Sequence, residues 1–188
     1  MNHEITVSVI IPAYNCAEFI ETAIDSVLIQ NVPLEIIVIN DCSTDHLEEV
    51  LERYSSDIRI RILNNEKNLG VAQSRNKGVA AARGKYVAFL DADDQWMPGK
   101  LEKQLEMLEK TGLVLCCTAR ELMEYDGTPT GQILSPNEII TYRQLKLQNQ
   151  IGCSSVVIKT ETAREFPMHH DDGHEDYLMW LEVLEKYG

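Results

Sequence analysis

Short apolar runs alternate with longer amphipathic segments along the first half of the chain. Apolar runs of strand length cover residues 7–12, 35–39 and 84–90, and a weaker strand is predicted at 59–63. Between these runs, apolar side chains recur at helical spacing within residues 19–28, 47–54 and 72–82. Strands that alternate with helices predict βαβ units, and these units build a mainly parallel sheet with right-handed crossovers.

The second half of the chain has a less regular pattern. Pro98 is predicted to open a helix. Further strands are predicted at 113–117 and 152–159, a hairpin turn at 125–129, and partly helical structure at 137–149. The last predicted helix covers residues 175–184, and its inward face carries Leu178, Leu181 and Leu184.

Polar residues follow three of the predicted strands at the point where each strand ends. Tyr14 and Asn15 follow the first strand, residues 41–43 follow the second, and residues 91–93 follow the fourth. Ligands of open parallel sheets bind beyond the carboxyl ends of the strands. The sequence therefore predicts one site built from three loops. Asn15, with Glu18 three positions later, also fits a capping box at the start of the next helix.

The fourth predicted strand ends in three carboxylates, those of Asp91, Asp93 and Asp94. Carboxylates are unfavourable in a core, so the chain must reach a surface or a cleft at this point. On extended backbone, Asp91 and Asp93 point to the same side. A hard divalent cation placed between them and a phosphate would make use of this arrangement. The alternative is an acidic turn that caps the next helix.

The length and composition are those of a soluble globular domain. The chain has 188 residues and a formal net charge of −13, which argues against binding to nucleic acid or to anionic lipid. An anionic substrate would need a bridging cation or local basic residues. The sequence has neither an apolar run of membrane-spanning length nor a signal-peptide pattern, so we expect a cytoplasmic protein without an integral membrane segment.

The cysteines and histidines leave two questions open. The cysteines are scattered without metal-binding spacing, at Cys16, Cys42, Cys116, Cys117 and Cys153. We therefore expect reduced thiols and no zinc site, and Cys153 is either a nucleophile or an inert core thiol. His169, His170 and His174 lie among acidic residues, where they form either a second metal site or a solvated loop.

Five segments together resemble the family 2 glycosyltransferases, in the order in which that family has them. These segments are 7–15, 38–45, 69–76, 89–94 and 175–180, and they extend over nearly the whole chain. The resemblance implies the GT-A fold, a Rossmann-like three-layer α/β sandwich with a mainly parallel central sheet and an acidic DxD motif at a strand end. It also implies an enzyme that transfers a sugar from a nucleotide diphosphate donor to an acceptor hydroxyl, usually with inversion.

The resemblance further implies a nucleotide site. The nucleotide-binding positions of the family correspond here to Pro12, Ala13, Tyr14, Asn15, Asp41, Ser43, Arg75, Asp91 and Ala92. Among them, Asp41 would accept the imide N–H of the base, Arg75 would lie against the nucleotide, and Asp91 would approach the ribose. The expected base is uridine, so the expected donor is a UDP-sugar.

The resemblance implies chemical roles for two more motif residues. Asp93 would hold Mn²⁺ or Mg²⁺ on the diphosphate, and Asp176 matches the catalytic base of the family. A divalent ion stabilises the negative charge that builds on a departing nucleoside diphosphate. A carboxylate that accepts the proton of an alcohol helps this poor nucleophile to react. Inversion needs only one such base, and a retaining mechanism through Glu175 has no motif in its support.

The resemblance also sets expectations for organisation and partners. It implies one domain over residues 1–188, with a nucleotide-binding half at 1–112 and an acceptor-side half at 113–188. The acceptor would be a growing surface polysaccharide, a lipid-linked glycan or a protein glycan, which places the protein in the cytoplasm or at the inner face of the membrane. The resemblance does not decide whether the protein forms a homo-oligomer. Family members commonly continue beyond the helix of Trp180, so we expect either a shortened chain or a compact member.

Several residues have simpler alternative roles. Asp41 could cap the helix at 47–54, Arg75 could pair with a surface carboxylate, and Glu175 could serve only the helix dipole. Trp180 could belong to the core or to the wall of an acceptor site. For the whole chain, the alternatives are a catalytically silent nucleotide-sugar binding module and, with weaker support, a phosphatase of the Asp-x-Asp type.

Overall fold

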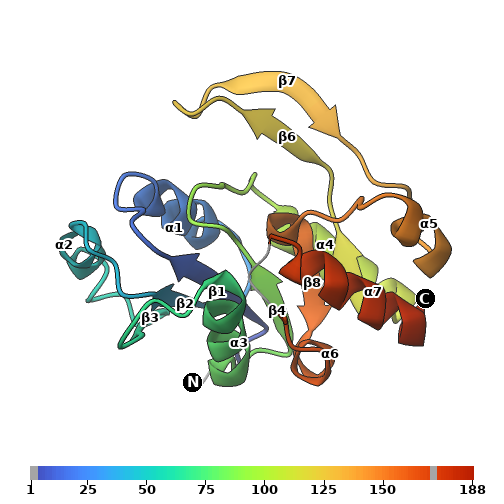
Figure 1. The fold of residues 1–188 in the computed structure, drawn as a ribbon, viewed down its shortest axis with the longest axis horizontal. Helices are drawn as coiled ribbons and strands as arrows, with labels where there is room; N and C mark the ends of the chain where they lie inside the picture. Colours follow the sequence, from blue (N-terminus) through green and yellow to red (C-terminus); the bar gives the residue numbers. More distant parts are fainter. Residues whose placement is uncertain (1–3, 170–172) are drawn as a thin grey trace.

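The computed structural model describes residues 4–169 and 173–188, and its centre is a six-stranded sheet with the order β3-β2-β1-β4-β8-β5 (Figure 1). The first four strands in this order pair in parallel, whereas β8 pairs antiparallel with both β4 and β5. The strands are β1 Val7–Ala13, β2 Leu34–Asn40, β3 Ile60–Asn64, β4 Tyr86–Phe89, β5 Leu115–Cys117 and β8 Val156–Lys159. The prediction of a mainly parallel sheet is confirmed.

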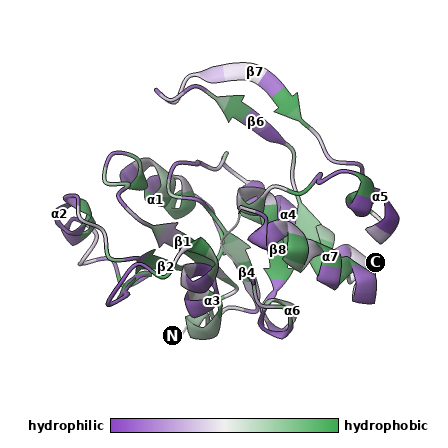
Figure 2. Ribbon diagram, viewed as in Figure 1, coloured by the Kyte–Doolittle hydropathy of each residue, from purple (hydrophilic) through white to green (hydrophobic). Residues whose placement is uncertain are grey.

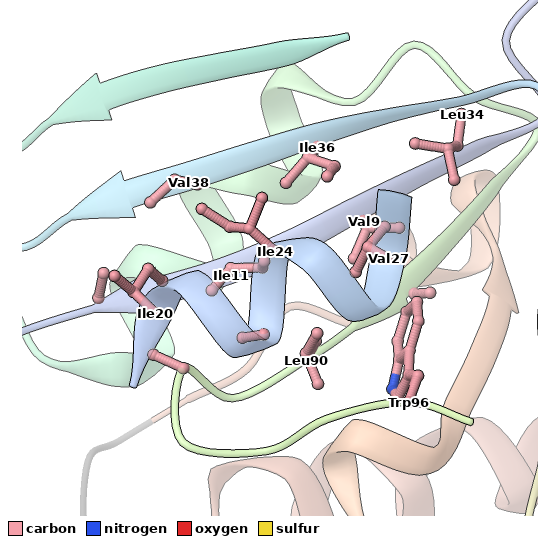
Figure 3. Close-up of a cluster of buried hydrophobic side chains, with 14 of the residues drawn as sticks. Val9, Ile11, Ile20, Ile24, Val27, Leu34, Ile36, Val38, Leu90 and Trp96 are labelled. Atoms are coloured by element: carbon pink, nitrogen blue, oxygen red, sulfur yellow. The ribbon is translucent and has the colours of Figure 1, made fainter. Parts of the chain in front are cut away.

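Helices cover both faces of this sheet and complete a three-layer sandwich. One face packs against α1 Ile20–Leu28, α2 Leu47–Glu52 and α4 Lys100–Thr111, and the other against α3 Val71–Ala81, α6 Thr160–Glu165 and α7 Glu175–Tyr187. The side chains of β1 alternate between the layers, because Val9 and Ile11 belong to one core and Ile10 to the other. Figure 3 shows the first of these cores, where Ile24 of α1 lies over Ile36 of β2.

The colouring by hydropathy separates the buried sheet from its surroundings. Apolar residues concentrate on the central strands β1, β2 and β4, and the helices carry polar residues on their outer surfaces (Figure 2). Residues of β1 and β2 are almost all buried, which is the pattern of a parallel sheet covered on both faces. Within the residues that the structure describes, no helix is both long and apolar enough to span a bilayer.

A two-stranded hairpin stands apart from the three layers (Figure 1). It consists of β6 Arg120–Met123 and β7 Pro129–Leu134, which pair antiparallel around the predicted turn. Tyr125 at its end reaches back to α1: its hydroxyl donates to Glu18 Oε2 at 3.2 Å, and its ring meets Phe19 edge-on with centroids 5.3 Å apart. The hairpin is therefore attached to the start of α1.

Pro12 lies inside β1, although a proline cannot donate to a central ladder. The Ile10 carbonyl accepts from Leu90 on the β4 side, and the Ala13 carbonyl accepts from Asp41 on the β2 side. Successive residues of a strand direct their polar groups to alternate sides, so the nitrogen of Pro12 faces the β4 side. Pairing between β1 and β4 ends at Ile10, and the missing N–H therefore leaves no ladder bond unmade.

Some predicted boundaries are wrong. The predicted strand at 152–159 begins with a 3-10 turn, η1 Cys153–Ser155, and the helix predicted to open at Pro98 starts at Lys100. Helix α6 was missed because its six residues show no apolar periodicity. A short helix, α5 Tyr142–Leu147, begins with a complete capping box. The inward face of α7 also differs from the prediction: Leu178 is exposed, and the buried residues are Glu175, Met179, Trp180, Val183 and Leu184.

Gly78 allows α3 to lie close against the sheet. A Cβ atom at this position would lie 2.5 Å from Ile10 Cγ2 and 2.9 Å from Ile39 Cδ1, and both side chains are buried. Alanine favours a helix over glycine by about 1 kcal/mol, but overpacking a core costs about 1–3 kcal/mol. We expect Gly78→Ala to lower the free energy of unfolding in a urea titration by about 1 kcal/mol.

The matched control is Gln73→Ala on the exposed face of the same helix, where the change should stay within about 0.5 kcal/mol. If Gly78→Ala were as stable as the unsubstituted protein, the close approach of α3 to the sheet would not limit packing.

Candidate functional site

The ends of β1, β2 and β4 border one cavity of about 640 Å³. Nine of the residues singled out in the sequence line it, namely Pro12, Ala13, Tyr14, Asn15, Asp41, Arg75, Asp91, Ala92 and Asp93. The remaining lining residues are Cys16, Phe19, Asn68, Gly70, Val71 and Ser74. Ser43 and Asp176 do not line the cavity. The structure thus brings the three polar strand ends together, as an open parallel sheet requires.

The loops after β1 and β2 are joined to each other by hydrogen bonds. Asn15 and Cys42 both have positive φ values, of 50° and 61°, which are uncommon for residues other than glycine. The Asn15 amide N–H donates to Ser43 Oγ at 3.1 Å, and its side-chain oxygen accepts from the Thr44 N–H at 2.8 Å. The predicted capping box of Asn15 and Glu18 is therefore wrong, because α1 starts at Ile20 without a side-chain cap.

Asp41 is buried and organises the loop before α3. Its Oδ1 accepts from Asn65 Nδ2 at 2.7 Å and from the Leu69 N–H at 2.9 Å, and its Oδ2 accepts from the Gly70 N–H at 2.9 Å. The alternative that Asp41 caps α2 is wrong, because Asp45 accepts the N–H at the start of that helix. A carboxylate has about four acceptor positions, so Asp41 keeps acceptor capacity toward the cavity.

Arg75 of α3 connects the loop after β4 with the start of α7. Its Nη2 donates to Asp91 Oδ1 at 2.6 Å and its Nη1 donates to Glu175 Oε1 at 2.6 Å. Burial disfavours the charge on Arg75, but the neighbouring Cys153 and the carboxylates of Asp91 and Glu175 outweigh that cost and raise its pKa. Arg75 therefore does pair with carboxylates, as the alternative expected, but its own side chain is buried, as is that of Glu175. Glu175 lies in the first turn of α7, where it can interact with the helix dipole, and it also forms an ion pair with Arg75.

Buried polar atoms without partners lie next to this ion pair. In the described part of the chain they include Arg75 Nε and Glu175 Oε2. Trp180 belongs to the core and packs on Phe89 with ring centroids 6.1 Å apart. Unsatisfied polar groups in an interior are unfavourable, and they require a specific explanation where they occur. Both of these atoms belong to the ion pair that borders the cavity.

The three carboxylates after β4 have different surroundings. Asp91 is bound to Arg75, whereas Asp93 is exposed at the cavity and makes no hydrogen bond or ion pair with other described residues. Burial raises the pKa of Asp94, and the charges of Asp91 and Asp93 raise it further. Asp93 is therefore the carboxylate of this loop that is least engaged by the rest of the described protein.

Asp176 lies in the first turn of α7, directly after the ion-paired Glu175. Burial raises its pKa most and the charge of Glu175 adds to this effect, while the Tyr177 N–H and Arg75 oppose it. The Tyr177 N–H donates to Asp176 Oδ1 at 2.6 Å. The carboxylate of Asp176 therefore has more affinity for a proton than an exposed aspartate.

The other candidate groups do not form a second centre within the described residues. His170 lies outside them, and among residues 4–169 and 173–188 no group of three or more histidine, cysteine or acidic side chains could hold a metal ion. His169 borders a separate cavity of about 340 Å³ together with residues of α5 and α7. Complete burial raises the pKa of Cys153 well above that of a free thiol, which favours the inert core thiol over the nucleophile.

Sequence reasoning missed several residues of the site. Phe19 was expected only as a core residue of α1, yet it lines the cavity. Asn68 and Ser74 carried no separate signal beyond their place in polar segments. Ser154 was read as part of a strand, although its hydroxyl accepts a hydrogen bond from the Asp91 N–H at 3.0 Å. Only a three-dimensional arrangement connects positions as distant as these.

The family model "Glycosyl transferase family 2" matches residues 8–162. The chain belongs to this family. TuaG of Bacillus subtilis (strain 168), named a putative teichuronic acid biosynthesis glycosyltransferase, is 40% identical over 182 residues, which are 96% of this chain and 72% of the relative. WfaP of Escherichia coli is 36% identical over 181 residues, which are 96% of this chain and 70% of the relative. Its name is UDP-Glc:alpha-D-GlcNAc-diphosphoundecaprenol beta-1,3-glucosyltransferase.

Solved structures of two other proteins have the same fold. TarS residues 1–349 of S. aureus in complex with UDP-GlcNAc align with a TM-score of 0.79 and 20% identity, over 96% of this chain and 53% of that one. The mannosyltransferase PcManGT of Pyrobaculum calidifontis, in complex with GDP-Man and Mn²⁺, aligns with a TM-score of 0.75 and 19% identity, over 99% and 54%. The chain thus spans about half the length of these structures.

These comparisons decide the broadest predictions. The predicted family and the α/β GT-A fold are confirmed, and the glycosyltransferase class is confirmed at the level of the family. The family match contradicts the alternative of an Asp-x-Asp phosphatase. The roles of the individual residues stay predictions.

The raised pKa of Asp176 predicts a pH-dependent effect on stability. A carboxyl group whose pKa is higher in the folded state than in the unfolded state binds protons on folding, so its charged form destabilises the fold at neutral pH. We expect Asp176→Asn to raise the free energy of unfolding at pH 7–8. The difference should shrink as the pH falls through the folded pKa, and it should vanish below about pH 4, near the unfolded value.

Urea titrations of both proteins between about pH 3 and pH 8 measure this difference across the unfolded pKa of aspartate. Glu182→Gln, at an exposed carboxylate of the same helix, should change the free energy of unfolding by less than about 0.5 kcal/mol. A destabilised Asp176→Asn protein at pH 8 would contradict the burial argument.

Proposed function

We propose that this chain is the donor-binding and catalytic part of an inverting, metal-assisted glycosyltransferase that uses a UDP-sugar. The acceptor is the hydroxyl of a lipid-linked glycan in surface polysaccharide synthesis. The observation that carries this proposal is the common cavity lined by Tyr14, Asp41 and Asp93, three residues from three strand ends. Its volume of about 640 Å³ falls within the usual range for ligand sites, about 300–1,000 Å³.

The choice of donor rests on the named relatives. WfaP has UDP-Glc in its name, and TarS structures contain UDP-GlcNAc or UDP. The PcManGT complex contains GDP-Man, so a protein with this fold can also bind a guanine nucleotide. The relatives thus favour uridine and leave the sugar open between glucose, N-acetylglucosamine and others. A thermal-shift panel of UDP-sugars and GDP-sugars addresses both choices.

The residues of the cavity suit a nucleoside. The ring of Tyr14 is half exposed and can stack against a flat base. Asp41 has acceptor capacity left for an imide N–H after its bonds to Leu69 and Gly70. Pro12, Ala13 and Ala92 would provide the walls, and Asp91 would lie at the ribose. Asn15 and Ser43 would contribute by holding the two loops together, since their polar groups are bonded to each other and to Thr44.

The carboxylates after β4 fit a divalent cation. Asp93 offers a free, exposed carboxylate, and Asp91 has an oxygen in addition to the one bound to Arg75. Oxygen ligands of this kind suit Mg²⁺ and Mn²⁺, and the remaining ligands would come from the diphosphate and water. When bound, the ion would neutralise the charge of the departing diphosphate. The PcManGT complex with Mn²⁺ supports this assignment.

Asp176 is the proposed base. The acceptor oxygen forms a bond to the anomeric carbon, its proton passes to the Asp176 carboxylate, and the bond to the diphosphate breaks to release UDP. The raised pKa of Asp176 suits it to accept a proton near neutral pH. Glu175 is buried and ion-paired with Arg75, so it is poorly placed to act as a nucleophile. This supports inversion over retention.

The proposal also covers partners and location. The acceptor named for WfaP is linked to diphosphoundecaprenol, which favours a position at the inner face of the membrane for a protein that acts on such lipids. Residues 113–188 would form the acceptor side, because they supply Asp176 and the hairpin next to α1. The net charge of −13 argues against nucleic acid as a partner.

The metal role predicts the effect of Asp93→Asn. The substitution removes a negative charge from the proposed cation site and keeps the size of the side chain. We expect the affinity for UDP in the presence of Mn²⁺ to fall at least about tenfold, or about 1.4 kcal/mol, in isothermal titration calorimetry. Glu106→Gln, at an exposed carboxylate of α4, is the control and should bind as before. Undiminished Mn²⁺-dependent binding by Asp93→Asn would refute the metal role.

The base role predicts a different pattern for Asp176→Asn. This variant should bind UDP and Mn²⁺ with the affinity of the unsubstituted protein, because Asp176 does not line the donor cavity. Its rate of transfer to a GlcNAc-diphosphate-lipid acceptor should fall about 10²–10⁴-fold, the usual contribution of a general base. Full retained transfer would exclude Asp176. Donor binding without any transfer by the unsubstituted chain would favour the silent binding module.

A further inference from the structure

Ser154 contacts the acidic loop, which we define as residues 91–96 after β4, at both of its ends. Its hydroxyl oxygen accepts from the Asp91 N–H at 3.0 Å, and its carbonyl oxygen accepts from Trp96 Nε1 at 2.7 Å. The same hydroxyl lies near the Asp94 carboxylate, where its polarity lowers the pKa of Asp94 against the effect of burial. A hydroxyl has one donor and two acceptor positions, so it can accept from Asp91 and donate to Asp94 together. Ser154 is distant in sequence from the loop that it holds.

The acidic loop has little other backbone support. The last ladder bond of this strand runs from the Leu90 N–H to the Ile10 carbonyl, at 3.0 Å. Beyond it, the Asp94 N–H bonds to the Asp91 carbonyl within the same turn, and the Trp96 N–H donates to Ser26 Oγ. Asp93 itself makes no hydrogen bond with the described residues. The direction of its carboxylate therefore follows from the backbone that Ser154 fixes.

The turn that carries Ser154 is itself firmly held. Cys153 on one side is buried, and Ser155 on the other side donates its hydroxyl to the Gly152 carbonyl at 2.6 Å. The Ser155 carbonyl accepts from Gln104 Nε2 of α4 at 3.0 Å and from the Thr118 N–H at 3.3 Å. These bonds anchor η1 to α4 and to the end of β5. The position of Ser154 is therefore fixed, and its hydrogen bond with the Asp91 N–H fixes this part of the acidic loop.

We propose that Ser154 is a positioning residue for the carboxylates that receive the metal–diphosphate group. This inference rests on the proposed function, because it concerns the same cavity. The Ser154 hydroxyl keeps the Asp91 N–H and the Asp94 side chain in place, so that Asp93 is presented to the cavity. Without that hydroxyl, the loop relaxes and the affinity for nucleotide that depends on the metal declines.

Two neighbouring serines provide a matched test. Ser154 and Ser155 belong to the same turn, but the Ser155 hydroxyl bonds only to its own turn. We expect Ser154→Ala to weaken UDP binding in Mn²⁺ about three- to tenfold, the effect of losing one or two hydrogen bonds. In EDTA its affinity for UDP should equal that of the unsubstituted protein. Ser155→Ala should lower the thermal unfolding midpoint at least as much, yet keep Mn²⁺-dependent binding.

Two further variants separate chemistry from shape. Ser154→Thr retains a hydroxyl and should restore Mn²⁺-dependent binding. Ser154→Cys retains the size but offers only a weak donor and acceptor, so it should resemble Ser154→Ala, and it replaces that variant if the alanine protein does not fold. Calorimetry with UDP alone, UDP with Mn²⁺ and UDP with EDTA provides the readout.

The outcomes are distinguishable. If the unsubstituted protein shows no Mn²⁺-dependent UDP binding, the proposed function fails and this inference with it. If that protein binds but Ser154→Ala binds equally well, the positioning role alone is overturned. Equal losses in Ser154→Ala and Ser155→Ala would also overturn it, because they would reduce Ser154 to a general stabilising residue.

Discussion

The buried ion pairs of Arg75 are the interaction on which the arrangement of the site depends. The guanidinium connects α3 to Asp91 after β4 and to Glu175 at the start of α7. Removing one partner of a buried pair leaves an uncompensated charge, at a cost of about 3–5 kcal/mol. The three segments are therefore held together as a unit. In the proposed reaction, this unit contains the carboxylates for the diphosphate on one side and the base for the acceptor on the other.

The sheet explains why Arg75 can reach both partners. Parallel strands with helices between them bring the ends of β1, β2 and β4 to one edge. Gly78, about one turn after Arg75, lets α3 approach the sheet, and the Arg75 guanidinium contacts the loop that follows β4 through Asp91. The positive φ values of Asn15 and Cys42 turn the first two loops toward each other. Local strain of this kind persists where the surrounding structure fixes it.

The sequence was sufficient for the parallel half of the sheet and for the convergence of its strand ends. Apolar runs such as that of β2 are long and uninterrupted, and residues like Asp41 and Asp93 stand at their ends. Periodicity reports burial, but it does not reveal which distant side chains meet. Arg75 and Glu175 are separated by 100 positions, and the pair has no local signal. For the same reason, the bonds of Asn15 to the second loop and the role of η1 could not be predicted.

The hydrogen bonds of Asp41 have a consequence for how such a pocket can evolve. This one side chain supports the chain before α3 through Leu69 and Gly70, and its replacement would leave buried N–H groups without acceptors. Each such group costs about 1–3 kcal/mol. In the proposed nucleotide site, a change to another nucleobase would thus have to come from neighbours such as Tyr14, whose half-exposed ring makes no comparable set of structural hydrogen bonds. The proposed selectivity for a base could therefore change through Tyr14, whereas Asp41 would be retained because the fold requires its hydrogen bonds.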